Sequence, residues 1–531
     1  MPQQLKDHSL KQLNSHYLAK LTPEELLHLS TKLLHDLKEA REQLNQNSSN
    51  SSKPPSSRHP WETAPTVTPA EAPKADAATE EPAESPDTSG IPSPPPVAAS
   101  AKPAKRKAGK QPGSPGYGRV WHPPIDGSEH HQISHCEACG RALASGSHQA
   151  YSAYDSVDVR FGSEAQPGLT VITTRHHLYD STCTCGHCTR YIPSRSTPDA
   201  VLYPAVEVGE WRLIGANLAA LIVHLRLRSR LSLRLTQELL HDLFGIPLSV
   251  GALQQCFEEA AASAAPLEDA LVEDLLAEVT RREGVLYIDE TSWKERGEAL
   301  WLWTFVTTLS VCFYVGKRTI EMLDNVIGTR FEGWLMSDGY QAYRHHPKRL
   351  RCWAHLIRKA RGLAEALDKD ARAFGHFTLA WLGTLQTAIY AWREAGGMAG
   401  TATDVIRRHY QDKLAEFRAL CLVNAESAHD KTAALAKEFI NDWKAIFRIL
   451  DHPWLPLTNN DAERALRHWV ILRKTNHGTK SATGSRAFAM LASISSTCRK
   501  RGQSALAYLA SVINAARAGL CLPALPQGVG M

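Results

Sequence analysis

The 531-residue sequence has no run of the roughly 18 or more uninterrupted apolar residues that a membrane-spanning helix needs. Its first residues lack the charged and then apolar layout of a secretory signal. Eleven cysteines are too few for a disulfide scaffold in a chain of this length. These absences argue against a membrane protein and a secreted protein, and they predict a soluble intracellular protein with reduced thiols.

A strong net charge is also missing, because 60 Lys and Arg residues nearly balance 55 Asp and Glu residues. The local distribution is less even. Residues 339–364 hold seven Lys or Arg and no acidic residue, and residues 464–502 hold nine and again none. One basic run is usually a solvated helix face. Two such runs beside candidate carboxylates favour a polyanionic partner.

Large apolar residues are nearly absent from residues 47–120, which are rich in Ser, Pro and Ala and are predicted to form a disordered linker. Residues 22–46 before it follow a helical pattern. Thr22-Pro23-Glu24-Glu25 is a capping box with proline at the first helical position. The apolar residues that follow have heptad spacing, which fits a short coiled coil or an amphipathic helix packed on its own protein equally well.

Cysteine pairs with metal-ligand spacing occur in residues 121–200. The pairs are Cys136 with Cys139 and Cys185 with Cys188. Paired thiolates suit tetrahedral Zn²⁺, so a four-cysteine site is favoured over unligated cysteines. The 45 residues between the pairs exceed the roughly 15–20 of a compact ribbon, and an insertion is expected to fold between them. Three further residues stay open as alternative ligands: His135, Cys183 and His187.

Residues 201–280 follow a helical pattern that contains a candidate helix-turn-helix. A first helix leads to a turn at Gly245-Ile246-Pro247, and Ser249 can cap a second helix. Short helical hairpins are common, so plain helix packing is slightly favoured over DNA recognition on this pattern alone.

Four β-prone runs follow residue 284, with a helix expected at about 318–328. The runs are GVLYID, ALWLWTFVTT, VCFYVGK and GWLMSD. Asp289 closes the first run and Asp338 closes the last. If those strands are neighbours, both carboxylates project from one edge of a sheet. Two close carboxylates repel each other unless a cation neutralises them, and Mg²⁺ prefers such oxygen ligands.

A third carboxylate would complete a two-metal site for phosphoryl displacement. Glu463 is the candidate, because Asn459 or Asn460 can cap a helix and place it in the first turn. Asp461 competes with it but fits the capping turn better. By residue type alone, the simpler interpretation that the two aspartates merely end strands would prevail.

The motifs YIDET, SDGYQAY, CWAHLIRKA and NNDAERALR occur in this order. Together they resemble the catalytic region of a DDE transposase, and more narrowly that of the insertion sequence sixty-six family. The resemblance covers most of residues 22–520 apart from the linker. It implies a multidomain α+β protein with a ribonuclease H-like α/β catalytic core, a zinc-ribbon-like module, a helical DNA-binding region and an N-terminal coiled-coil-like helix.

The implied domains follow the order of these parts along the chain. They are a leucine-zipper-like helix at 1–46, the linker at 47–120, a zinc-finger module at 121–200, the helical region at 201–280, the catalytic core at 281–500 with a large helical insertion at about 364–455, and a C-terminal segment at 501–531.

The resemblance assigns roles residue by residue. Asp289, Asp338 and Glu463 would be catalytic and would hold Mg²⁺ or Mn²⁺, while Zn²⁺ at the cysteines would be structural. The separation of 125 residues from Asp338 to Glu463 is long, and the helical insertion accounts for it. His355 would lie near the site, although it also fits an ordinary buried histidine. Six basic residues would contact DNA phosphates: Arg358, Lys359, Arg464, Arg467, Arg473 and Lys474.

The implied activity is metal-dependent strand cleavage at the ends of an insertion sequence, followed by strand transfer to target DNA. The implied partners are the terminal repeats, the target DNA, further copies of the chain and companion proteins of the same element. The implied location is the bacterial cytoplasm, at the nucleoid. The alternatives are a non-catalytic DNA-binding regulator or domesticated transposase, and a metal-dependent nuclease that cuts without strand transfer.

Overall fold

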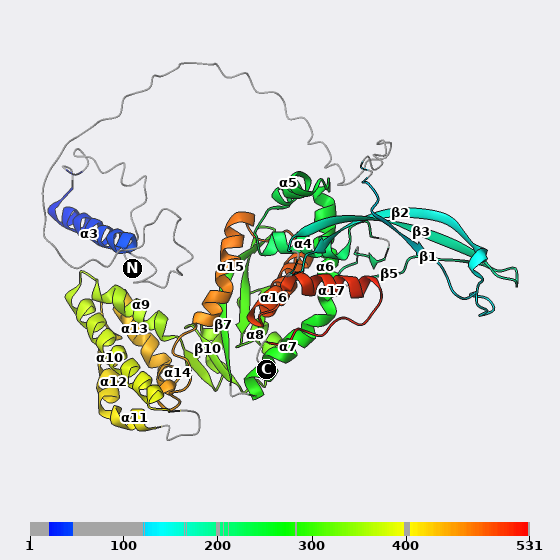
Figure 1. The fold of residues 1–531 in the computed structure, drawn as a ribbon. Coiled ribbons are helices and arrows are strands. Elements are labelled where there is room, and N and C mark those ends of the chain that lie inside the picture. The colour runs from blue at the N-terminus through cyan, green and yellow to red at the C-terminus, as the bar shows by residue number, and fades with distance from the viewer. Residues whose placement is uncertain are drawn as a thin grey trace, which may run out of the picture. The chain divides into compact units, whose positions relative to one another are not determined.

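The computed structural model shows a mixed α+β protein with many helices and several sheets (Figure 1). The described residues are 18, 21–45, 121, 123–163, 165, 167–197, 202–204, 206–210, 212–281, 284–397 and 404–528. The predicted linker at 47–120 lies outside them. No described helix combines the length and the apolar character that crossing a membrane requires.

The first described helix, α3 (Pro23–Asn45), begins at the predicted capping box. The Glu25 backbone N–H donates to the Thr22 hydroxyl over 3.3 Å, and the Thr22 N–H donates to the Glu25 carboxylate over 2.9 Å. This reciprocal pair satisfies two backbone donors at the helix start and confirms the predicted cap. Leu27 and Leu37 are exposed on this helix, and the coiled coil stays a prediction.

The cysteine-bearing module is a four-stranded sheet. Its strands are β1 (Gly127–His131), β2 (His148–Phe161), β3 (Leu169–Thr182) and β4 (Cys188–Arg190). β2 and β3 pair antiparallel as a long ribbon (Figure 1), and β1 runs parallel to β3 on its other side. The ribbon therefore forms the insertion expected between the two cysteine pairs. Three short elements complete this region: the 3-10 helix η2 (Ser145–Ser147) and the paired strands β5 (Arg195–Ser196) and β6 (Val208–Gly209).

A buried carboxylate joins this module to the helices that follow it. Asp158, near the end of β2, accepts the Leu218 backbone N–H over 2.7 Å in the first turn of α4 (Ala216–Leu227). An anion at this position complements the positive end of the helix. Gly215 precedes the helix and leaves no room for a side chain, since a Cβ there would lie 2.0 Å from the Asp158 Cγ. The module therefore packs directly against the helical region.

Six helices pack together beside the central sheet. They are α4, α5 (Leu233–Phe244), α6 (Val250–Ala264), α7 (Glu268–Arg281, after the 3-10 helix η3, Ala265–Leu267), α16 (Ala482–Lys500) and α17 (Ala505–Arg517). Arg517 of α17 forms a buried ion pair with Glu259 of α6 at 2.8 Å. The C-terminal helix thus shares a core with helices that precede the central sheet in sequence.

α5 and α6 have the local features predicted for the helix-turn-helix. Gly245 ends α5 with a left-handed backbone (φ 63°), and the Ser249 hydroxyl accepts the Ala252 N–H over 3.1 Å to cap α6. However, α6 is buried against α4, α16 and α17, and its exposed residues are confined to its first turn and Gln255. A recognition helix needs a free face for the major groove. The contacts therefore favour plain helix packing.

The central sheet has five strands in the order β11-β10-β7-β8-β9. They are β7 (Val285–Glu295), β8 (Glu298–Val306), β9 (Val311–Gly316), β10 (Trp334–Ser337) and β11 (Arg349–Arg351). β7, β8 and β9 are antiparallel neighbours, whereas β10 and β11 run parallel to β7 on its other side. The four strands predicted from the β-prone runs are confirmed. The helix expected at about 318–328 is also confirmed, as α8 (Ile320–Ile327).

The prediction that Asp289 closes the first strand is wrong. β7 continues for six residues beyond it to Glu295, because its second half pairs with β8 as a hairpin. Arg296 and Gly297 both have positive φ, 51° and 93°, as a tight hairpin turn requires. Trp293 in this extension is 1% exposed. Burial of Trp293 and pairing with β8 therefore extend β7 beyond Asp289.

A helical bundle occupies the region between β11 and α15 (Asn460–Asn476). Its helices are α9 (Trp353–Ala364), α10 (Lys369–Glu394), α11 (Val405–His409), α12 (Gln411–Asn424), α13 (Asp430–Asn441) and α14 (Trp443–Phe447), followed by the 3-10 helix η5 (Arg448–Leu450). Arg349 and Arg351 of β11 are buried and form ion pairs with Asp442 at 2.6 and 3.0 Å. These pairs anchor the bundle to the sheet. The short 3-10 helix η4 (Gln341–His345) precedes β11.

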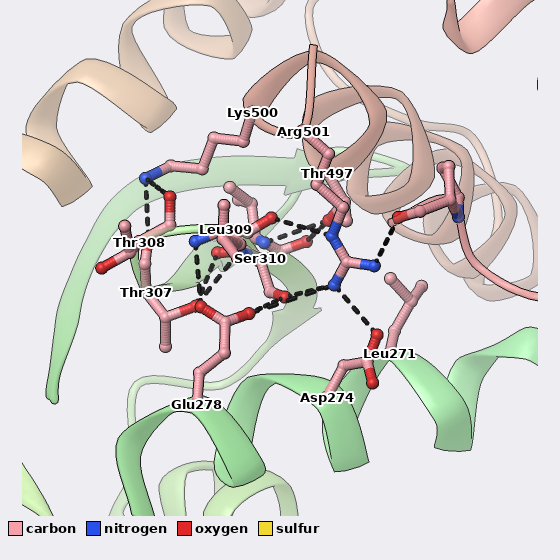
Figure 2. Close-up of polar contacts among 12 residues, drawn as sticks. Leu271, Asp274, Glu278, Thr307, Thr308, Leu309, Ser310, Thr497, Lys500 and Arg501 are labelled. Carbon is pink, nitrogen blue, oxygen red and sulfur yellow. Dashed lines mark hydrogen bonds and ion pairs between the residues drawn. The ribbon is translucent and has the colours of Figure 1, made fainter. Parts of the chain in front are cut away.

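A second group of matched charges fixes the turn between β8 and β9 (Figure 2). We call Asp274, Glu278, Ser310 and Arg501 the Arg501 clamp. Arg501 donates to the Asp274 carboxylate over 2.9 Å and to the Ser310 hydroxyl over 2.8 Å. Glu278 accepts the Leu309 backbone N–H over 2.9 Å. Since Arg501 is only 5% exposed, the clamp links α7, the end of α16 and the sheet through buried polar contacts.

Candidate active site and cysteine centre

Two of the predicted carboxylates lie at the same level of the central sheet. β10 pairs parallel with β7 in a register that sets Met336 opposite Tyr287. Asp338 and Asp289 each follow two residues later, so the register brings both to the same point along neighbouring strands. Asp338 comes just after β10, where its carboxylate accepts the Tyr340 backbone N–H over 2.8 Å.

The third predicted carboxylate, Glu463, is positioned by the start of α15. Asn459 precedes that helix, and its side chain donates to the Ile288 carbonyl over 2.7 Å. This bond ties the helix start to the residue before Asp289, and Glu463 lies in the first helical turn, as predicted. Asn459 therefore anchors the helix to the sheet with its side chain, which makes no capping bond.

Burial and the neighbouring acidic groups both change the pKa of Asp289. Burial raises this pKa well above its usual value, and the charges of Glu290, Asp338 and Glu463 raise it further. The Glu290 backbone N–H, which donates to Asp289 over 2.9 Å, acts in the opposite direction. We call these four residues the acidic cluster. The other three members destabilise the charged form of Asp289, and a bound cation would relieve this repulsion.

Glu290 is a site residue that the sequence reasoning did not assign. Its side chain is buried, pairs with Arg318 at 2.6 Å and accepts a hydrogen bond from the Tyr343 hydroxyl. Burial raises the pKa of Glu290 to about 7, and the charge of Asp338 adds to this effect. In the sequence, the position of Glu290 beside Asp289 in a β-prone run could have indicated that it belongs to the candidate site. Strand alternation sends Glu290 to the opposite face from Asp289.

Glu463 is held by basic and polar neighbours. Arg358 donates to its carboxylate over 2.9 Å, and His355 Nδ1 lies 3.8 Å from the same oxygen. Burial and then the charge of Arg358 lower the pKa of His355 to about 3, so this histidine is neutral near pH 7 and its contact is not an ion pair. Within the described chain, the Glu463 oxygen falls in a compact ligand group with His355 and Cys352, and not with the two aspartates.

An open cleft of about 500 Å³ lies beside Asp338. Its basic lining comes from four parts of the chain. The basic side chains are Arg318 after β9, Arg344 of η4, Lys359 of α9 and Lys437 of α13. The helical bundle therefore contributes directly to the surface beside the candidate active site.

The six basic residues predicted to contact DNA fall into two groups. Arg464, Arg467 and Lys474 are exposed on α15. The other three are partly buried. Arg358 bonds to Glu463, Lys359 pairs with Glu438 at 2.6 Å, and Arg473 donates to the Thr291 hydroxyl over 3.0 Å. The two groups therefore differ in how far they reach into solvent.

The donor chemistry of the acidic cluster fits a divalent cation. Mg²⁺ and Mn²⁺ favour carboxylate oxygens and keep several waters. Asp289 on β7 and Asp338 just after β10 lie at the same level of the sheet, and Glu463 lies in the first turn of α15. The residues present therefore suit the catalytic cation that the resemblance implies.

Four cysteines gather at one end of the module. Their sulfur atoms lie within 4.8 Å of one another, and the members are Cys136, Cys139, Cys183 and Cys185. The Cys136 and Cys185 sulfurs are 3.7 Å apart, and those of Cys139 and Cys183 are 3.5 Å apart. Tetrahedral Zn²⁺ with bonds of about 2.3 Å separates its thiolates by about 3.8 Å. The cysteine group therefore fits Zn²⁺.

The gathered cysteines differ from the predicted ligand set at one position. Cys183, which was an alternative, lies in the group, and Cys188 does not. The Gly186 N–H donates to the Cys183 carbonyl over 2.9 Å, and Gly186 has a positive φ of 85°. The tight turn therefore starts at Cys183, and Cys188 begins β4, where it pairs with Thr182. The predicted alternatives His135 and His187 also lie outside the group.

Comparisons with known proteins agree with the motifs. Residues 10–82 match a family of unknown function (DUF6444). No curated protein matches the chain. Residues 212–487 match the Transposase IS66 family, and this match spans more than half of the chain, from the helical region through the acidic cluster to α16. The protein therefore belongs to the Transposase IS66 family.

Proposed function

We propose that the chain is a DDE-type transposase that cleaves DNA at the ends of an insertion sequence and joins the freed 3′-hydroxyl to target DNA. The gathering of Asp289, Asp338 and Glu463 carries this proposal, because the three residues come from distant parts of the sequence. Family membership supports transposase function in general.

We further propose that residues 281–500 form a ribonuclease H-like core, with the helical insertion at about 364–455. The strand order supports this, since three antiparallel strands are followed by two that run parallel to the first. In this arrangement β7, the end of β10 and α15 each contribute one carboxylate. The insertion lies between the second and third carboxylates in sequence and returns the chain to the sheet at α15.

Asp289, Asp338 and Glu463 would hold Mg²⁺ or Mn²⁺, and a bound divalent cation supplies an activated water and neutralises charge on the reacting phosphodiester. Arg358 donates to the Glu463 carboxylate over 2.9 Å and orients it. His355 is neutral and borders both Glu463 and the cleft. The mechanism needs no serine or tyrosine nucleophile, because water and then the DNA 3′-hydroxyl attack.

The cleft beside Asp338 is the proposed path of the scissile strand. Lys359 and Lys437 line it from α9 and α13, and Arg464 and Arg467 extend the basic surface along α15. Lysine and arginine side chains neutralise phosphates without reading sequence. The helical insertion would thus be part of the DNA-binding surface.

We propose a structural Zn²⁺ on Cys136, Cys139, Cys183 and Cys185, with the module contacting the terminal repeats. A homo-oligomer would bring two element ends together, and companion proteins of the element would assist. Activity on chromosomal DNA would locate the protein at the nucleoid.

Cleavage of a labelled duplex of the element's end tests the proposal. The purified full-length protein is assayed with Mg²⁺ or Mn²⁺ and with EDTA, beside the Asp338→Asn variant. Metal-dependent cutting that the variant loses is expected. A precut end then separates a transposase, which joins it to target DNA, from a nuclease, which does not. Specific DNA binding with no cleavage in the presence of the companion proteins would favour a regulator instead.

A further inference from the structure

A second group of metal-ligating side chains lies in the cysteine-bearing module. Glu129 and His131 belong to β1, and His176 belongs to β3. The parallel register sets Glu129 opposite His176, and residues two apart on a strand share a face. All three side chains therefore lie on one face of the sheet. The neighbouring His130 and His177 lie on the other face, where their rings stack at 4.9 Å.

The three potential ligand atoms converge on one point. His131 Nε2 lies 2.9 Å from His176 Nδ1. The Glu129 carboxylate lies 3.2 Å from His176 Nδ1 and 4.0 Å from His131 Nε2. Tetrahedral Zn²⁺ with bonds of about 2.0–2.1 Å holds its nitrogen and oxygen ligands about 3.3 Å apart. The three separations bracket that value, so small side-chain shifts would accommodate a cation.

The surroundings orient both imidazoles. The Ser156 hydroxyl lies 2.8 Å from His176 Nε2, the ring nitrogen that faces away from Glu129. Metal-bound histidines usually have such an oxygen partner on their second nitrogen. Tyr154 stacks on His176 at 4.6 Å, and Tyr191 stacks on His131 at 5.1 Å. Two of the ligands are therefore held in place before any ion binds.

In the tautomer of His176 that carries its proton on Nε2, protons alone leave this arrangement incomplete. When His176 Nε2–H donates to Ser156, the Nδ1 of the neutral ring carries a lone pair. His131 can donate one proton to that lone pair. The Glu129 carboxylate then faces the same atom at 3.2 Å with no donor between them. A cation at the centre would satisfy all three lone pairs together.

We propose that Glu129, His131 and His176 form a second metal site, separate from the cysteine group, that binds a borderline divalent transition-metal ion such as Zn²⁺. Two imidazoles and one carboxylate leave a fourth position for water or a further ligand. The side chain of Glu129 is 61% exposed, so solvent reaches that position. A bound ion would cross-link β1 to β3.

Metal content of the full-length protein tests the site. The protein is loaded with Zn²⁺, dialysed, and analysed by mass spectrometry of its metals. Wild type is expected to hold about two Zn²⁺ per chain and the His131→Ala/His176→Ala variant about one. The matched control is His130→Ala/His177→Ala, which removes two histidines from the opposite face and is expected to keep both ions.

Cobalt substitution shows whether the loss is local. Co²⁺ bound to thiolates gives an intense near-ultraviolet band, whereas Co²⁺ on nitrogen and oxygen does not. A His131→Ala/His176→Ala variant that keeps the thiolate band but loses one ion supports the proposal. If that variant loses the band, Glu129→Gln replaces it and is expected to weaken the second ion by about tenfold or more. One Zn²⁺ per chain in wild type, or equal content and affinity in wild type and these variants, overturns the proposal.

Discussion

The acidic cluster and the Arg501 clamp are two groups of charged residues beside one sheet. In the clamp opposite charges are paired, whereas in the cluster like charges lie near one another. In the clamp, Arg501 meets Asp274 at 2.9 Å and the Ser310 hydroxyl at 2.8 Å. In the cluster, three neighbouring carboxylates all raise the pKa of Asp289. Matched charges stabilise the fold, whereas gathered like charges oppose it. The difference supports the proposal that the acidic cluster binds a cation and that the clamp stabilises the fold.

The largest expected effect comes from removing one charge from the acidic cluster. Asp289→Asn, Asp338→Asn and Glu463→Gln are each expected to lower strand cleavage by more than about 1000-fold, beyond the usual loss from one active-site electrostatic contact. Because Asp289→Asn and Asp338→Asn relieve repulsion at Asp289, the free energy of unfolding of these two variants without metal is expected to stay equal or rise. Gel assays and denaturant unfolding measure the two quantities.

Asp461→Asn is the matched control, since it removes a carboxylate from the same helical turn as Glu463. It is expected to cleave at the wild-type rate. Normal cleavage by one of the three cluster variants would remove that residue from the site.

The clamp is expected to respond in the opposite way. Arg501→Met is expected to lower the free energy of unfolding by about 3 kcal/mol, because it removes a buried guanidinium that pairs with Asp274 and donates to Ser310. This value is the low end of the roughly 3–5 kcal/mol that breaking a buried ion pair costs, because the Asp274 side chain is 39% exposed. Urea unfolding followed by circular dichroism measures the free energy of unfolding. Arg499→Met changes the exposed neighbour and is expected to cost less than about 0.5 kcal/mol. Equal losses of unfolding free energy in Arg501→Met and Arg499→Met would contradict the stabilising role of the Arg501 clamp.

A pH series sharpens the comparison further. The pKa of Glu290 is raised from 4.5 to about 7 in the folded protein. Its contribution to stability is therefore fully present below about pH 4.5 and is lost as the pH rises through about 7. In EDTA, the unfolding free energy of wild type is expected to fall over this window, and Glu290→Gln is expected to flatten the fall.

Glu298→Gln serves as the control for this series, because it changes an exposed carboxylate at the start of β8. It is expected to keep the wild-type profile. A Glu290→Gln profile as steep as that of wild type would contradict the assignment of the window to Glu290.

The smallest effect is expected from the exposed arginines of α15. Arg464→Ala and Arg467→Ala are each expected to weaken DNA binding modestly and to reduce the slope of log affinity against log salt by about one. Fluorescence anisotropy over a salt series measures this. Arg372→Ala, on the exposed side of α10, is the control and is expected to leave the slope unchanged. An unchanged slope in the α15 variants would exclude them from phosphate contact.

Local sequence patterns predicted much of the central sheet but not its limits. β-prone runs and turn residues predicted β7 to β10, and the capping box predicted the start of α3. The extension of β7 beyond Asp289 depends on burial of Trp293 and on pairing with β8. Such tertiary contacts override a boundary read from a polar residue.

The site shows the same division between local and tertiary information. The three carboxylates were predicted from motifs, yet their approach depends on the register of β7 with β10 and on the Asn459 bond to Ile288. Cys183 replaced Cys188 because a backbone turn, and not Cys-x-x-Cys spacing, sets which sulfurs meet. Glu290 was missed because its partner Arg318 lies 28 residues away in sequence.

Mn²⁺ binding to the full-length protein, followed by electron paramagnetic resonance without DNA, tests the central claim most directly. The cysteine group is first filled with Zn²⁺, and wild type is compared with Asp289→Asn and with Asp461→Asn. If the acidic cluster is kept for a cation, wild type and Asp461→Asn bind Mn²⁺ alike, and Asp289→Asn binds it at least about tenfold more weakly. Equal Mn²⁺ affinity in wild type and Asp289→Asn would contradict the account.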